Sequence, residues 1–168
     1  MKGKKTYTAD GVGAVFACDG DWSHMTDLWF ELDALSAKCA GLCGLSETGY
    51  CILCNLLEYG QGRTQTEIYK SDILNKQTVN SGVKQLIAEN VLRAEAHGRE
   101  KKLFLTEKGK RLMEGRVIPL VQIDNDAFCA IPRAERERFI SILGTYKQNF
   151  ENRLAAFAAA KTKEKERI

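Results

Sequence analysis

The chain has 168 residues, of which 44% are hydrophobic and 28% are charged, with six cysteines and a formal net charge of +3. This size and composition indicate one globular domain that buries its own core and needs no disulfides. No apolar run approaches the ~20 residues of a membrane span, and the N-terminal segment lacks the apolar stretch of a signal peptide. We therefore expect a cytoplasmic protein with reduced thiols and no membrane partner.

Residues 1–20 show no hydrophobic period and contain four glycines, so we expect an irregular arm there. From Asp21 the pattern changes to large apolar residues every three to four positions, which predicts an amphipathic helix closed by Gly41 and Gly44. Its apolar stripe consists of Trp22, Met25, Leu28, Trp29, Leu32 and Leu35.

Three further helix starts follow. Ser46 can cap a second helix, which stops at "YGQG", residues 59–62. Thr64 and Glu67 form a T-x-x-E capping box for a short helix. Asn75 can cap a longer helix, with an inner face made of Val79, Val83, Leu86 and Ile87.

The period then changes again, from helical spacing to alternation. Residues 91–96 and 101–106 alternate on either side of the turn "HGRE", which predicts a β-hairpin. Two short helices joined by a turn and followed by a hairpin make a winged helix–turn–helix. The predicted fold class is therefore mostly α with a small β-hairpin wing (α+β).

The C-terminal third of the chain is predicted to be helical. Thr106 can cap a helix that Pro119 is expected to kink, and a final long helix starts near Pro132. The apolar stripe of the final helix consists of Phe139, Ile142, Leu143, Tyr146, Phe150, Leu154 and Phe157. We divide the chain into an arm (1–20), the first helix and loop (21–44), the winged lobe (45–112), C-terminal helices (113–160) and a charged tail (161–168).

Positive charge is concentrated in one region. Residues 60–111 contain eleven Lys/Arg against six Asp/Glu, a net charge of +5, whereas the rest of the chain has fourteen against sixteen, a net charge of −2. This asymmetry indicates an anionic partner that binds to the winged lobe.

The side chains predicted to meet that partner are those that suit double-stranded DNA. The second helix of such a pair enters the major groove, and its outer face here is polar with no carboxylate before Glu89. The start of the preceding helix can hold a phosphate through side chains and free backbone amides, and the wing tip can reach the minor groove or the backbone. The predicted DNA-binding residues are Lys76, Gln77, Thr78, Asn80, Ser81 and Lys84 on the helix, Thr64, Gln65 and Thr66 before it, and His97, Arg99, Lys101 and Lys102 on the wing.

Three stretches, "LSETGYCILCNLLEYG", "TQTEIYKSDILNKQTVNSGVKQLIAENVL" and "GREKKLFLTEKGKRLMEGRVIPL", occur in the order typical of one family. Over residues 21–157 the sequence resembles the MarR family of dimeric winged-helix transcriptional regulators. It departs from that family at His97, where an aspartate usually braces the wing arginine, and at Asn90, where glycine is common. Because asparagine tolerates the left-handed backbone, we expect the turn at Asn90 to form.

The resemblance implies that the first and last helices of two subunits interleave into a homodimer, which reads a pseudo-palindromic operator. It also implies a small aromatic effector between the dimer helices and the DNA-binding lobe, with Trp29, Phe30 and Tyr50 as pocket candidates. A ligand-responsive repressor is therefore expected, with neither enzymatic activity nor a cofactor. In the oxidation-sensing branch a cysteine stands where this chain has Asp27.

The cysteines leave a second function open. Cys39, Cys43, Cys51 and Cys54 follow a C-x3-C-x7-C-x2-C spacing, so a thiol-based metal- or redox-responsive protein is the alternative. Against this alternative, the last two fall within a predicted helix, at the flank of its buried stripe, and the first two in the loop before it. Free cysteine commonly serves as a small buried hydrophobe, and we therefore predict no metal ligand.

Overall fold

The computed structural model describes residues 21–71, 74–98 and 100–165. The predictions made for the arm (1–20), for Arg99 and for the last part of the tail (166–168) lie outside the described residues. The chain divides into two compact units, Met1–Leu120 and Val121–Ile168, and each is described by itself.

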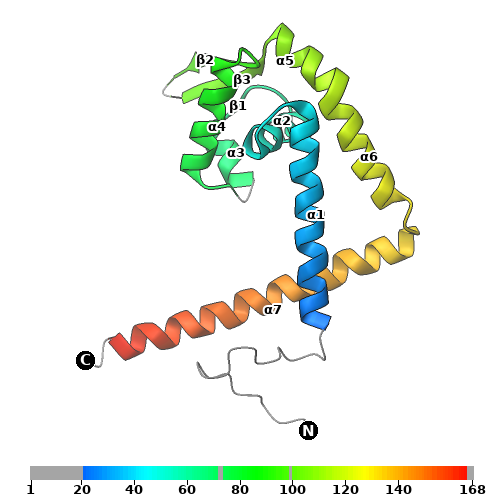
Figure 1. The fold of residues 1–168 in the computed structure, drawn as a ribbon. Helices are drawn as coiled ribbons and strands as arrows, with labels where there is room; N and C mark the ends of the chain where they lie inside the picture. The colour runs from blue at the N-terminus through cyan, green and yellow to red at the C-terminus, as the bar shows by residue number, and fades with distance from the viewer. Residues whose placement is uncertain (1–20, 72–73, 99, 166–168) are drawn as a thin grey trace. The chain divides into compact units, whose positions relative to one another are not determined.

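The first unit contains the elements of the predicted winged lobe, preceded by the first helix and followed by the start of the C-terminal helices (Figure 1). They are α1 (Asp21–Cys43), α2 (Glu47–Tyr59), β1 (Arg63–Thr64), α3 (Gln65–Ser71), α4 (Lys76–Ala88), β2 (Leu92–His97), β3 (Glu100–Leu105), α5 (Glu107–Leu112), a π-helical segment (Met113–Val117) and the start of α6 (Ile118–Cys129). The predicted fold class, mostly α with a β-hairpin wing, is confirmed.

The sheet has one strand more than the sequence predicts. Its order is β1-β3-β2, and all pairs are antiparallel. The hairpin pairs Leu92 with Leu105 and His97 with Glu100, while the short strand β1 pairs Arg63 with Leu103. Because β1 leads directly into α3, this pairing attaches the base of the wing to the helix pair.

Three helix starts are capped as predicted. The side chains of Ser46, Asn75 and Thr106 accept hydrogen bonds from backbone N–H groups three residues later, at 3.2, 2.9 and 3.0 Å. Each such cap is worth about 1 kcal/mol, because it satisfies a donor that the helix itself leaves unpaired.

The core of this unit lies between α2, α4 and the wing. Val79, Val83 and Leu86 on the inner face of α4 are buried, as predicted, whereas Ile87 is 39% exposed and does not belong to that face. Other buried apolar side chains are Ala40, Cys43, Ile52, Leu53, Leu56, Ile68, Val91, Leu92, Leu103, Leu105, Met113 and Val117.

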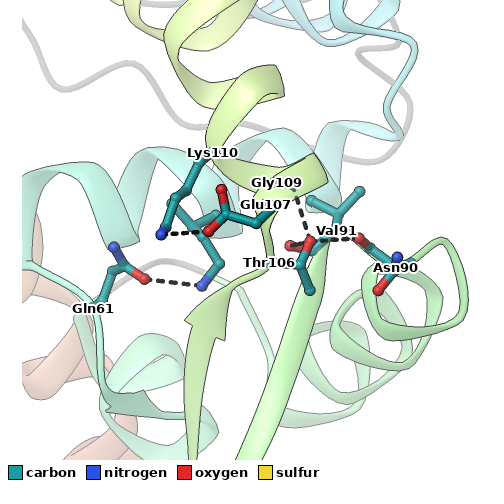
Figure 2. Close-up of polar contacts among 8 residues, drawn as sticks. Gln61, Asn90, Val91, Thr106, Glu107, Gly109 and Lys110 are labelled. Atoms are coloured by element: carbon teal, nitrogen blue, oxygen red, sulfur yellow. Dashed lines mark hydrogen bonds and ion pairs between the residues drawn. The ribbon is translucent and has the colours of Figure 1, made fainter.

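The junction between α4, the wing and α5 is held by backbone carbonyls (Figure 2). Asn90 has a φ of 56°, so the chain turns there as expected. The Thr106 hydroxyl donates to the carbonyl of Asn90 at 2.6 Å, and the Thr106 N–H donates to that of Val91 at 3.0 Å. Gly109 packs directly against the Val91 carbonyl, because an added Cβ would lie 2.1 Å from its oxygen.

The predicted kink at Pro119 takes the form of a π-helical turn. The N–H of Ile118 donates to the carbonyl of Met113, five residues back, immediately before the proline. Proline has no N–H and its ring clashes with the carbonyl four residues earlier, so the wider turn relieves that clash and the helix continues.

The second unit contains the rest of α6 and the long helix α7 (Arg133–Lys165). The rings of Phe128 and Phe139 meet edge to face at 6.4 Å, and Arg136 donates to the carbonyls of Cys129 and Ile131, both at 2.6 Å. These contacts join the end of α6 to the start of α7.

Among the described residues, no single helix is long and apolar enough to cross a membrane. Only α1 and α2 taken together, bent by 88° where they join, meet such a criterion. The inner face of α2 is buried in the core of the first unit, which accounts for its apolar composition.

Replacing Gly109 with alanine tests the α4–wing–α5 junction. The new methyl group would overlap the Val91 carbonyl, which is backbone and cannot rotate away, so we expect a loss of about 3 kcal/mol in the free energy of unfolding. Urea denaturation measures this. Gly41→Ala is the matched control, because an added Cβ meets nothing within 4 Å there. Equal stability of both variants would contradict the packing described.

Candidate nucleic-acid interface

Helices α3 and α4 form the predicted helix–turn–helix. Ile68, which is fully buried, is the residue through which α3 enters the core. Asn75 caps α4 and fixes where the second helix starts. Two residues of the turn, 72–73, lie outside the described part of the chain.

The outer face of α4 is where the predicted DNA-contacting residues gather. Lys76, Gln77, Ser81 and Lys84 are exposed, and Thr78 and Asn80 are half-buried beside them. Since the opposite face is buried in the core, these side chains are presented on a rigid helix. The face carries two lysines and no carboxylate, which suits contact with phosphates and base edges.

A shallow hollow borders this face and includes residues that sequence reasoning missed. Its volume is about 420 Å³, and it is lined by Ser46, Thr48, Gln77, Thr78, Ser81, Gly82 and Gln85. The start of α2 reaches α4 because residue 82 is glycine: an added Cβ would lie 2.6 Å from the Thr48 methyl carbon. The sequence signals Ser46 as a cap, but only tertiary packing places it beside α4.

Thr64 lies in an enclosed place at the start of α3. Its side chain is buried, with 5% exposed, and its hydroxyl and N–H both donate to the Glu67 carboxylate, at 3.0 and 2.7 Å. The capping box predicted for these two residues is therefore formed. It engages the Thr64 hydroxyl and N–H, the groups that were expected to hold a phosphate. Gln65 and Thr66 are half-buried in the first turn of α3.

The wing presents a mixture of charges. His97 and Lys101 are exposed near its tip, whereas Lys102 is half-buried and pairs with Thr64 of β1. On the same hairpin Arg93 forms an ion pair with Glu95 and lies over the Phe104 ring, 5.0 Å from its centroid. Arg93 is thus engaged within the wing. Of the predicted wing residues that the structure describes, His97 and Lys101 are the exposed ones.

Hydrogen bonds from Thr64 hold the pKa of Glu67 below its ordinary value of 4.5. The main cause is the Thr64 backbone N–H, followed by its hydroxyl, with smaller contributions from the charges of Arg63 and Lys102. At neutral pH the Glu67 carboxylate is therefore ionised and fixed at the start of α3.

No family model matches the sequence, and no curated protein matches it either. Solved structures do match. A MarR family regulator from Neisseria meningitidis has a TM-score of 0.68 at 20% sequence identity, over 80% of this chain and 96% of that chain. BpsR of Bordetella bronchiseptica has a TM-score of 0.57 at 20% sequence identity, over 74% of this chain and 98% of that chain. The transcriptional repressor CouR, bound to a 23-mer DNA duplex, has a TM-score of 0.59 at 18% sequence identity, over 84% of this chain and 98% of that chain. The chain has the fold of MarR family regulators.

The three effector-pocket candidates lie in different surroundings in the described structure. Trp29 and Phe30 are 55% and 66% exposed on α1. Tyr50 is buried in α2, where its hydroxyl is hydrogen-bonded to the Cys54 thiol. Four cavities in the described part of the chain are lined by other side chains.

The structure places the four thiols of the alternative function on helices α1 and α2. Cys39 and Cys43 lie in α1 and not in the loop predicted for them, because the helix continues through Gly41. Burial raises the pKa of the Cys54 thiol to about 11 and that of Cys43 above its ordinary value. A metal ligand or nucleophile must be a thiolate. The described residues contain no group of three or more His, Cys, Asp or Glu side chains that could hold a metal ion.

Substituting Glu67 with glutamine tests the capping box through its pH dependence. A lowered pKa means that ionised Glu67 stabilises the fold above the ordinary value of 4.5, and that this contribution is lost as pH falls through the lower pKa of the folded state. Glutamine does not titrate, so its variant should lose less stability than the parent between pH 7 and a pH well below 4.5.

Urea denaturation at the two pH values measures this difference. Glu58→Gln, which removes an exposed carboxyl of α2, is the control. If Glu67→Gln and the parent protein lose stability in parallel, the carboxylate does not act as described.

Proposed function

We propose that this chain is a sequence-specific DNA-binding transcriptional regulator, a MarR-like repressor that acts as a homodimer on a pseudo-palindromic operator. The observation that carries the proposal is the outer face of α4. This helix has a buried inner face, a capped start and exposed side chains without a carboxylate, within a segment of net charge +5. A helix so placed can enter the major groove, with the wing beside it.

The solved structures with this fold support the same function. CouR is a transcriptional repressor bound to a DNA duplex, and the protein from Neisseria meningitidis is a MarR family regulator. At 20% identity or less these likenesses show the fold, and the DNA-binding residues proposed here rest on this chain's own surface. Those residues are Lys76, Gln77, Thr78, Asn80, Ser81 and Lys84 on α4, with Gln65, Thr66, His97, Lys101 and Lys102 on α3 and the wing. Arg99 is proposed from its place in the sequence alone.

The proposed dimer uses the exposed apolar stripes of the first and last helices. Trp29, Leu32 and Leu35 on α1 are each more than half exposed, and so are Phe139, Phe150 and Phe157 on α7. Contiguous apolar surface of this kind marks an association site, because a monomer gains nothing by leaving it in water. In a C2 dimer both copies cover the same patch, which spaces the two wings for two half-sites.

The proposed regulator also responds to a small molecule. DNA binding by BpsR is regulated by 6-hydroxynicotinic acid, and this chain shares its fold. The thiol-based alternative is not proposed again, since no observation favours it.

Replacing Lys84 with glutamine tests the interface. Loss of one phosphate contact should weaken binding to a duplex from upstream of the protein's own gene, and should reduce the slope of log K against log salt by about 1. Fluorescence anisotropy over a salt series measures both quantities.

Lys147→Gln, in α7, is the matched control because it removes the same charge from an exposed lysine that is paired with Glu151 at 2.7 Å. Identical salt slopes for Lys84→Gln and the parent protein would remove α4 from the interface. A loss shared by both variants would point to overall charge alone.

Replacing Phe150 with glutamate tests the dimer. A charge in the middle of the α7 stripe should shift the protein from dimer to monomer, measured by analytical ultracentrifugation, because a carboxylate is costly to bury. Gln148→Glu adds the same charge about 200° round the helix and should leave the dimer intact. If the parent protein sediments as a monomer at micromolar concentration, the dimer proposal is wrong.

A further inference from the structure

Helix α3 is short and enters the core through a single side chain. It has seven residues, Gln65–Ser71, and of these seven only Ile68 is fully buried. A helix of this length is unstable by itself, and one apolar anchor leaves it free to turn about that point. Polar contacts at its two ends therefore decide its direction.

The start of α3 is fixed by the capping box described above, and its end is fixed by two side chains from other elements. Asn55 of α2, which is 3% exposed, donates from Nδ2 to the Ser71 hydroxyl oxygen at 2.8 Å. Arg63 of β1 donates from Nη2 to the same oxygen at 3.2 Å and to the Glu67 carbonyl at 2.9 Å. We call Asn55, Arg63 and Ser71 the α3 clamp.

The Ser71 hydroxyl is fully used in the α3 clamp. A serine hydroxyl has one hydrogen to donate and two lone pairs that accept. It accepts from Asn55 and Arg63, and its hydrogen is shared between the carbonyls of Glu67 and Ile68, both 3.0 Å from its oxygen. The α3 clamp thus closes the end of α3 and attaches it to α2 and β1 at the same time.

The Arg63 side chain is itself held in place. Its guanidinium lies over the Tyr59 ring, 4.6 Å from the centroid, where the aromatic face attracts a cation. Its backbone pairs with Leu103 of β3. Arg63 is half-buried, so it is a fixed donor to α3 whose described contacts lie within the lobe.

We propose that Asn55, Arg63 and Ser71 are positioning residues for DNA recognition. Ser71 ends α3, and Asn75 caps α4 four residues later, so the direction of α3 at Ser71 sets where the turn into α4 begins. Reading base edges requires that both helices keep a fixed register, whereas attraction to phosphates does not. This inference rests on the proposed function.

Replacing Ser71 with alanine removes the oxygen at which the α3 clamp converges. Ser71 is exposed and alanine favours a helix, so the fold is kept. Fluorescence anisotropy measures the affinity for two duplexes, one from upstream of the protein's own gene and a scrambled one of the same composition. We expect the preference for the upstream duplex to fall about tenfold, with binding to the scrambled duplex and the salt slope unchanged.

Three further variants accompany this experiment. Ser71→Thr keeps the hydroxyl and should restore the preference. Thr162→Ala is the matched control, because it removes an exposed hydroxyl of α7 that donates to the Ala158 carbonyl at 3.1 Å, and it should bind like the parent. Arg63→Met removes a second member of the clamp, and combined with Ser71→Ala it should cost less than the two single losses together, since the clamp acts as a unit.

Amide hydrogen exchange without DNA tests the α3 clamp apart from recognition. The amides of Ile68 and Lys70 in α3 should exchange faster in Ser71→Ala than in the parent, because α3 opens more often. Those of Val83 and Leu86 in α4 should exchange at the parent rate, which separates a local effect from a loss of overall stability.

Three results would each overturn the inference: an unchanged preference in Ser71→Ala, an equal loss on both duplexes, or unchanged exchange in α3. A smaller salt slope in Arg63→Met would make Arg63 a phosphate contact and would also overturn its positioning role. If Lys84→Gln weakens DNA binding while Ser71→Ala behaves like Thr162→Ala, this inference fails alone. A parent protein without any preference between the duplexes contradicts the proposed function, and this inference with it.

Discussion

The backbone carbonyls at the end of α4 hold the winged lobe together. Three in succession accept hydrogen bonds from the start of α5: that of Glu89 from Lys108, that of Asn90 from the Thr106 hydroxyl, and that of Val91 from the Thr106 N–H. Helices usually leave such groups to water. Their use here fixes the wing, which lies between α4 and α5 in the chain, at a set angle to the helix that presents Lys84. The DNA-binding geometry proposed above depends on this junction.

Local interactions explain what could be predicted from the sequence. The caps at Ser46, Asn75 and Thr106 and the left-handed turn at Asn90 depend on neighbours within a few residues, and all were predicted correctly. The features that were not predicted depend on contacts between residues that lie far apart in the sequence. Strand β1 has two residues and exists only because β3 pairs with it. The Cys39–Cys43 segment stayed helical because one glycine costs a helix only about 1 kcal/mol, which packing against α2 offsets. The hollow beside α4 combines residues from two segments that lie far apart in the sequence, the start of α2 and α4.

Gly109 also bears on how relatives of this chain can be recognised. The proposed DNA-contacting residues on the surface of α4 would differ wherever operators differ, and these solved structures are only 20% identical to this chain. The space over the Val91 carbonyl admits no side chain. The need for glycine at position 109 therefore comes from packing and does not depend on a DNA sequence. In distant sequences we expect a glycine three residues after the helix-capping threonine to persist where the DNA-contacting residues have changed. That pair marks the exit of the wing and supplies an anchor for alignment that the functional residues do not.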